Sequence, residues 1–133
     1  MDYRHLVQKA KEASEKSYSP YSHFPVGAAV LTRSGKVFTG CNVENASFGL
    51  TICAERTAIA KAISEGEKEF LALAIFCATD KYCSPCGACR QVINEFGHDV
   101  DVVMTNAAGD YIIKKSAELL PGAFTFARGK PGQ

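Results

Sequence analysis

Residues 70–78 most strongly limit what this chain can fold into, because FLALAIFCA is an almost continuous apolar run. An extended segment without polar alternation is typical of a strand that is covered on both faces. The run is also too short to cross a membrane as a helix. Helix signals precede and follow it, so the sequence predicts a sheet with helices packed on both faces.

Periodicity and turn residues predict the other elements. Helices are expected over residues 3–16, 51–65, 84–96 and 116–120. Further strands are expected over residues 26–32, 37–43, 100–105 and 111–113. The first helix is amphipathic and about four turns long. Thr51 and Ser84 are the expected N-caps of the second and third helices, with Pro85 in the first turn of the third.

The connections between these elements predict the topology. Helices link the second strand to the third and the third to the fourth, which implies parallel crossovers. The last two strands are separated by about five residues, which forces an antiparallel hairpin. The expected fold class is α/β: a three-layer α/β/α arrangement with a five-stranded mixed sheet whose last two strands form an antiparallel hairpin.

Length and charge narrow the classes of partner. The 133 residues suit one domain, 1–133, and the formal net charge is +1. A protein that follows a phosphate backbone usually carries a basic surplus, so nucleic acid is not an expected partner. The first residues have no apolar signal core, no apolar run approaches a membrane span, and the six cysteines are clustered at metal-like spacings. We therefore expect a cytoplasmic protein without a membrane partner.

The candidate metal site combines CAER, residues 53–56, with PCGAC, residues 85–89. Cys86 and Cys89 are three residues apart on one predicted helix, so both can bind one ion, and Cys53 supplies a third thiolate. Glu55 is placed to be a proton acceptor that is not itself a ligand. Three thiolates leave a zinc site negatively charged, and Arg56 could offset that charge, although a solvated helix position is the alternative for it.

Other interpretations of the cysteines remain open at this point. A structural zinc would need a fourth ligand, which Cys83 or, less plausibly, His98 could supply. Cysteines 83, 86 and 89 have an iron–sulfur-like spacing, but Ile93 stands where the next cysteine is expected. A redox pair at Cys86 and Cys89 would leave the upstream motif unexplained, and a disulfide is disfavoured in a reducing compartment.

The motifs together resemble the small homotetrameric zinc-dependent cytidine deaminases, whose signature is H-x-E…P-C-x-x-C with cysteine allowed for the histidine. The resemblance is carried by FPVGAA (24–29), GCNVENA (40–46), CAERTA (53–58), PCGACRQ (85–91) and LLPGAF (119–124). It implies a cytidine deaminase-like fold, one Zn²⁺ per chain, and a homotetramer whose active sites are completed by neighbouring subunits.

The resemblance also implies a set of substrate contacts. Phe24 would pack on the base, Asn42 and Glu44 would bind the ribose, and Ala54 would lie in the same pocket. Phe48 and Phe124 would reach the pocket of a neighbouring subunit. Phe48 stands where tyrosine is common in the family, so a hydroxyl contact is lost there. Independently, Asn42 and Glu44 are two apart at a strand end and should point to the same side.

The expected function is hydrolytic deamination of cytidine and 2′-deoxycytidine to uridine and 2′-deoxyuridine with release of ammonia, a reaction of pyrimidine salvage. Glu55 would accept the proton of the attacking water and return it to the base and the departing amine. The alternatives are a deaminase of a nucleoside-like antibiotic or of a base in nucleic acid, which would share the zinc chemistry. A zinc-stabilised interaction module would explain the cysteines but not Glu55.

Overall fold

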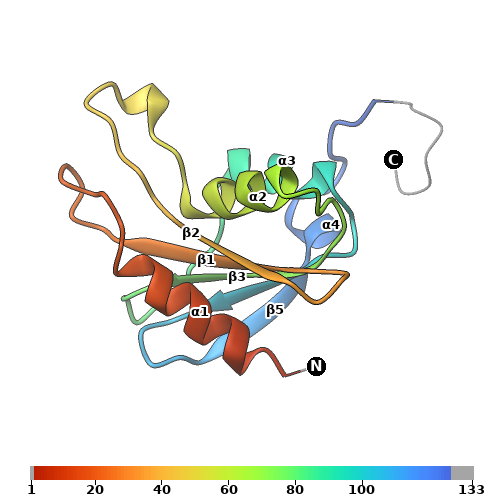
Figure 1. The fold of residues 1–133 in the computed structure, drawn as a ribbon, viewed down its shortest axis with the longest axis horizontal. Helices are drawn as coiled ribbons and strands as arrows, with labels where there is room; N and C mark the ends of the chain where they lie inside the picture. Colours follow the sequence, from red (N-terminus) through yellow and green to blue (C-terminus); the bar gives the residue numbers. More distant parts are fainter. Residues whose placement is uncertain (1, 127–133) are drawn as a thin grey trace.

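The computed structural model describes residues 2–126 and shows a five-stranded sheet in the order β2-β1-β3-β4-β5 (Figure 1). The strands are β1 (Val26–Thr32), β2 (Val37–Cys41), β3 (Phe70–Cys77), β4 (Asp101–Thr105) and β5 (Tyr111–Lys115). β1 pairs antiparallel with both β2 and β3, β3 pairs parallel with β4, and β4 pairs antiparallel with β5. The predicted mixed sheet is confirmed, with β1 lying between the two strands that the first crossover connects.

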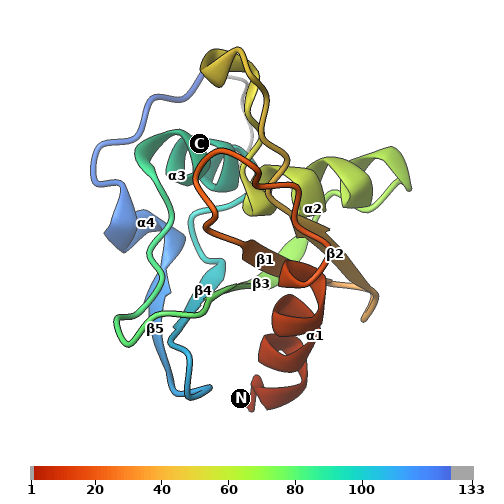
Figure 2. The same cartoon turned by 90° about the vertical axis from the view of Figure 1, so that its left-hand side faces the viewer.

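Helices cover both faces of the sheet, which confirms the three-layer prediction. α1 (Arg4–Ser14) lies on one face, whereas α2 (Ala54–Ser64), α3 (Gly87–Glu95) and the short α4 (Ser116–Leu119) lie on the other (Figures 1 and 2). The interior of β3 is buried almost throughout, as its apolar run predicted. Its side chains divide between two clusters, one beneath α1 and the other beneath α2 and α3.

Two glycines let the helices approach the β1–β2 hairpin closely. A Cβ atom on Gly27 would lie 1.9 Å from the carbonyl oxygen of Ala10 in α1. A Cβ atom on Gly40 would lie 2.5 Å from the backbone nitrogen of Ala58 in α2. α1 is therefore the element that packs closely against the small residues of β1.

The predicted starts of two helices are wrong. α2 has Cys53 as its N-cap instead of Thr51, because the Thr51 hydroxyl accepts a hydrogen bond from the Asn45 backbone and the chain remains extended through Ile52. α3 has Cys86 as its N-cap, two residues beyond Ser84, and Cys86 still has extended backbone angles.

The other boundaries differ less. α1 has 11 residues, about three turns instead of four, and ends at Ser14. A 3-10 turn, η1 (Phe48–Leu50), forms within a loop that projects from the body of the molecule (Figures 1 and 2). Within residues 2–126 there is no helix with the length and apolarity that crossing a bilayer would require. The tail over 129–133, which was expected to fray, lies outside the described residues.

Candidate metal centre and active site

The N-termini of α2 and α3 bring three cysteine sulfurs together. Cys53 and Cys86 are the N-cap residues of the two helices, and Cys89 is buried one turn into α3. Their Sγ atoms all lie within 4.8 Å of one another, and those of Cys53 and Cys86 are 3.9 Å apart. The crossovers on one face of the sheet therefore bring together residues that are 33 positions apart in the chain.

This cluster fits a zinc ion. A tetrahedral ion with Zn–S bonds of ~2.3 Å holds its sulfur ligands about 3.8 Å apart, and a site with three protein ligands keeps one position open. Among residues 2–126, the group that could hold a metal contains Cys53, Cys86 and Cys89 but neither Cys83 nor His98. The His98 ring instead makes a hydrogen bond of 3.1 Å with Asn94.

The thiols of the cluster have unequal proton affinities. The hydrogen bond with Cys89 lowers the pKa of the Cys53 thiol to about 5, with burial opposing this shift and Arg56 adding to it. The same hydrogen bond, followed by burial, raises the pKa of the Cys89 thiol. The metal-free cluster thus favours a thiolate at Cys53, and binding of a divalent ion would release the Cys89 proton.

Arg56 lies against the cluster. Its Nη2 atom is 3.4 Å from the Cys53 sulfur, so a positive charge faces the thiolates. Its Nε atom is buried without a hydrogen-bond partner among the described residues. These contacts favour charge compensation over the alternative of a solvated helix residue.

Glu55 is 5 % exposed, although it carries a carboxyl group. Burial, followed by the charge of Cys53, raises the pKa of Glu55 above the usual range for glutamate. A carboxyl group with a raised pKa can both accept and return a proton near neutral pH. Glu55 lies outside the metal-binding group, so it is available for this work.

A cavity of about 210 Å³ opens beside the sulfur cluster. Of the predicted site residues, the structure brings Phe24, Asn42, Cys53, Ala54, Glu55 and Cys86 to its wall. The sequence interpretation missed the remaining lining residues, which are Val26, Thr51, Cys83 and Ser84. Ser84 directly precedes the PCGAC motif, and the other three each lie two residues from Phe24, Cys53 or that motif, but the sequence does not show which way these side chains point.

Asn42 lies in the wall of the cavity and is held there by hydrogen bonds. Its side-chain oxygen accepts the Val26 backbone N–H at 3.0 Å and the Ser17 hydroxyl, and its amide donates to the Phe24 carbonyl at 2.9 Å. An asparagine amide has two donor hydrogens, so one has no hydrogen-bond partner among the described residues.

Glu44, like Asn42, makes its hydrogen bonds with the segment 17–26, but it does not line the cavity. Its carboxylate accepts the backbone N–H groups of Tyr21 at 3.0 Å and Ser22 at 3.1 Å, and also the Ser22 hydroxyl. The Ser22 hydroxyl is the main reason that the pKa of Glu44 is lowered. The carboxylate is therefore held against the backbone of residues 21–22, and its role in binding a ribose stays a prediction.

Two of the predicted aromatic contacts lie away from this cavity. Phe48 is 75 % exposed in the projecting loop, and Phe124 is 68 % exposed after α4. Neither ring belongs to the core of the single chain. The structure of a single chain leaves both rings outside its own cavity.

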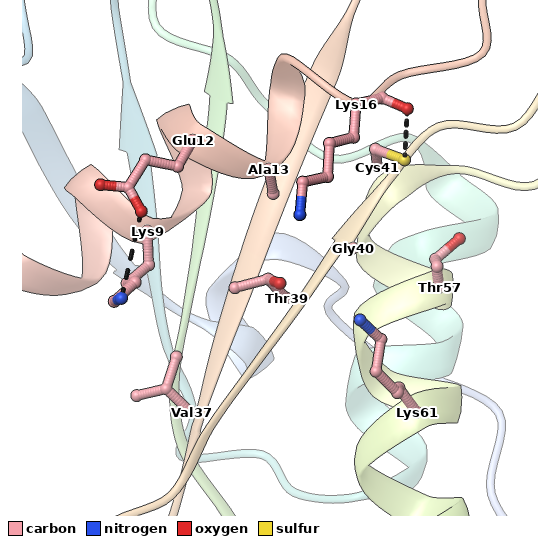
Figure 3. Close-up of a pocket in the computed structure, with 10 residues that line it drawn as sticks. All are labelled: Lys9, Glu12, Ala13, Lys16, Val37, Thr39, Gly40, Cys41, Thr57 and Lys61. Atoms are coloured by element: carbon pink, nitrogen blue, oxygen red, sulfur yellow. Dashed lines mark hydrogen bonds and ion pairs between the residues drawn. The ribbon is translucent and has the colours of Figure 1, made fainter.

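A second hollow, of about 450 Å³, lies between α1, β2 and α2 (Figure 3). Its wall carries Lys9, Lys16 and Lys61 around Gly40 and Cys41. Lys16, in the turn after α1, and Lys61, on α2, point from opposite sides toward the strand between them (Figure 3). It shares no lining residue with the smaller cavity and contains none of the metal-binding cysteines, so the predicted chemistry is confined to the smaller one.

The fold and the cluster define an α/β domain with a candidate metal site and a buried carboxyl group beside it. Residues 1–106 match the family described as "Cytidine and deoxycytidylate deaminase zinc-binding region". The chain therefore belongs to this deaminase family, and Cys53, Cys86 and Cys89 are the residues that could hold its metal.

Individual relatives resemble the chain over nearly its whole length. It is 50 % identical to the cytidine deaminase of Sporosarcina psychrophila over 126 residues, which cover 94 % of this chain and 93 % of that protein. The crystal structure of the cytidine deaminase from Burkholderia pseudomallei matches with a TM-score of 0.89 and 50 % identity, covering 93 % of this chain and all of that one. The blasticidin-S deaminase of Bacillus cereus is 30 % identical to this chain, and the match covers 90 % of each protein.

Proposed function

We propose that this protein is a cytidine deaminase that converts cytidine and 2′-deoxycytidine to uridine and 2′-deoxyuridine. The observation that carries the proposal is the buried Glu55 carboxyl group beside three clustered thiols at the end of a cavity. The similarity to two cytidine deaminases at 50 % identity supports the substrate class. We treat residues 1–133 as one catalytic domain.

Cys53, Cys86 and Cys89 would hold Zn²⁺, which supplies Lewis acidity that makes water a nucleophile at neutral pH. Glu55 accepts one proton from the attacking water and delivers it to N3 of the pyrimidine. It then accepts the second proton, from the hydroxyl newly bonded to C4, and delivers it to the 4-amino group as the C4–N bond breaks. Water and the nucleoside are consumed, and the keto product and ammonia are formed. The raised pKa of Glu55 suits both directions of transfer.

The remaining cavity groups would orient the nucleoside. The Phe24 ring is partly exposed at the cavity wall and offers a flat apolar surface to the base. Asn42 retains one amide hydrogen for a ribose hydroxyl, because its other hydrogen-bonding capacity is used by the protein. The Glu44 carboxylate, held by the backbone of residues 21–22, could accept a hydrogen bond from a second hydroxyl, and Ala54 in the cavity wall would lie beside the base.

Neighbouring subunits would complete the site in a homotetramer. Phe48 and Phe124 are large apolar rings that this chain leaves in solvent, as expected for side chains that contact another copy. Other large side chains are also exposed in the segments between α1 and β1 and between β2 and α2, namely Tyr18, Tyr21, Leu50 and Ile52. A cytoplasmic role in pyrimidine salvage is part of this proposal.

A deaminase of a nucleoside-like antibiotic is the second candidate, and the similarity to a blasticidin-S deaminase supports it. Its 30 % identity is lower than the 50 % found with cytidine deaminases. Ammonia release from cytidine, 2′-deoxycytidine, cytosine and blasticidin S by the purified protein would separate these substrates. Activity on the antibiotic alone would refute the first proposal.

Glu55→Gln tests the assigned chemistry directly. The variant should bind one zinc per chain, because Glu55 lies outside the thiol cluster, but turnover of cytidine should fall by at least about 100-fold because general acid–base catalysis is lost. Zinc is measured by atomic absorption and turnover by ammonia release. Turnover near that of the parent protein, with zinc retained, would contradict the role of Glu55.

A further inference from the structure

The Arg90 side chain bonds to two segments that lie far apart in the sequence, residues 84–85 and residue 119. Its Nε atom donates to the Pro85 carbonyl at 2.9 Å, and its Nη2 atom donates to the Ser84 hydroxyl at 2.8 Å. Its Nη1 atom donates to the Leu119 carbonyl at 2.9 Å. A planar guanidinium presents its donors in a fixed fork, so the three acceptors are held in a defined geometry relative to one another.

The first two acceptors belong to the segment that leads directly into a candidate metal ligand. Ser84 lines the cavity, and Pro85 immediately precedes Cys86. Cys86 is the most exposed of the three clustered cysteines and lies before the first turn of α3. The position of its sulfur therefore depends on how firmly this segment is held.

The third acceptor lies at the start of the segment that ends in the exposed aromatic residues. Gln91, next to Arg90, donates from Nε2 to the Phe124 carbonyl at 2.9 Å. In the same strip of α3, Asn94 donates to the Ser116 carbonyl at 3.0 Å. The segment after α4 runs past α3 (Figure 1), and these bonds fix its backbone while the Phe124 ring remains in solvent.

We propose that Arg90 is a positioning residue that couples the loop before Cys86 to the C-terminal segment, and that Gln91 fixes the backbone from which the Phe124 ring is presented. The inference rests on the proposed function, because the coupling affects catalysis only if Phe124 of another copy completes the active site. Lysine could not replace Arg90, since a single ammonium group cannot satisfy three acceptors arranged around a planar fork.

The two residues differ in what their loss should change. Loss of the Arg90 fork removes bonds to both segments, so zinc should leave faster and the C-terminal segment, then held by Gln91 and Asn94, should become more mobile. Loss of the Gln91 amide removes a bond to the second segment only, so zinc release should be unchanged. A residue that merely stabilised the fold would not separate these effects.

The experiment uses the zinc-loaded full-length protein with Phe126→Trp as a reporter background. The natural sequence contains no tryptophan, and Phe126 is 70 % exposed with its ring centroid 5.4 Å from that of Phe124. Fluorescence anisotropy of the introduced indole measures the mobility of the segment. Zinc release is followed with a chromogenic chelator, and KM and kcat for cytidine are measured in parallel.

Arg90→Met and Arg90→Lys should both release zinc about 10-fold to 100-fold faster than the parent, the usual effect of removing a group that supports a metal ligand. Both should lower the indole anisotropy. Gln91→Leu should lower the anisotropy and raise KM more than it lowers kcat, with zinc release within about twofold of the parent. Arg33→Met is the matched control, since Arg33 is an exposed arginine in the β1–β2 turn that pairs with Glu69.

Parent-like zinc release in Arg90→Met, or restoration of both readouts by Arg90→Lys, would overturn the coupling. Parent-like anisotropy in Gln91→Leu would overturn the role of that amide. Should Arg90→Met fail to fold, Arg90→Lys and Gln91→Leu decide the question. Zinc release and anisotropy need no substrate, so a protein that fails to deaminate cytidine would refute the proposed function without affecting these two readouts.

Discussion

Gly40→Ala should disturb the active site through the packing of α2. Gly40 lies in β2, two residues before Asn42, and α2 carries Glu55 and has Cys53 as its N-cap. The added Cβ would meet backbone atoms of α2, at 2.5 Å from the Ala58 nitrogen and 2.9 Å from the Ala54 carbonyl oxygen. Backbone atoms cannot rotate away as a side chain can, so helix and strand must separate.

The size of the effect follows from these distances. Ordinary contact between heavy atoms begins near about 3.5 Å, so α2 must move by roughly 1 Å. Overpacking of this kind costs about 1 to 3 kcal/mol, which lowers Tm by roughly 4 to 12 °C. A displacement of about 1 Å between Glu55 on α2 and the substrate groups that follow β2 can reduce kcat/KM about 100-fold.

Gly27→Ala is the matched control on the opposite face of the sheet. Its Cβ would lie 1.9 Å from the Ala10 carbonyl oxygen and 2.5 Å from the Ser14 nitrogen, both in α1. α1 carries none of the proposed site residues. Gly27→Ala should therefore lose more stability than Gly40→Ala but retain more activity per folded, zinc-loaded molecule.

Thermal unfolding and initial rates of cytidine deamination test this ranking. Rates are measured well below both Tm values and are divided by zinc content, so that unfolded protein does not enter the comparison. If Gly40→Ala is destabilised but keeps kcat/KM within about threefold of the parent, the strand–helix spacing does not set the site geometry. If Tm is unchanged, the packing argument itself is wrong.

Two other perturbations address the ligand set and the stability of the opposite face. Cys86→Ala should lose zinc and deaminase activity, whereas Cys83→Ala should keep stoichiometric zinc by atomic absorption; zinc retained in Cys86→Ala would point to Cys83 as a ligand. Burial alone would raise the pKa of Asp101, but hydrogen bonds from Lys115 at 2.7 Å and Tyr3 at 2.6 Å lower it below the unfolded value. The contribution of the Asp101 carboxylate to stability is therefore complete above about pH 4 and is lost as pH falls through the folded pKa. The loss of Tm in Asp101→Asn should be largest near neutral pH and should shrink below about pH 4. A loss of Tm that does not change with pH would contradict this linkage.

The fold could be predicted well because its signals are local or topological. The apolar run of β3 required cover on both faces, and the short connection after β4 left room only for an antiparallel partner. Gly66 has a positive φ of 91° just beyond the last turn of α2, a conformation that favours glycine and ends many helices. Such features depend on few residues and tolerate errors elsewhere.

The missed features depend on long-range contacts. Thr51 has the right side chain for an N-cap, but its hydroxyl is used by Asn45 in the preceding loop. Ser84 is equally suitable, but its hydroxyl accepts from Arg90 one turn into α3. In both cases a tertiary or loop contact outweighs the local preference, and no sequence pattern shows which will prevail.

The helix starts seen in the structure place two of the cysteines where they can bind a metal ion. Cys53 and Cys86 are N-caps, yet neither side chain makes a capping hydrogen bond, so both sulfurs remain available to an ion. Each sulfur also faces the positive end of a helix dipole, equivalent to about half a charge. Three thiolates around a divalent ion leave one excess negative charge, which would weaken the ion as a Lewis acid. Arg56 and the two helix ends supply positive charge at the cluster, which would offset that excess if an ion were bound.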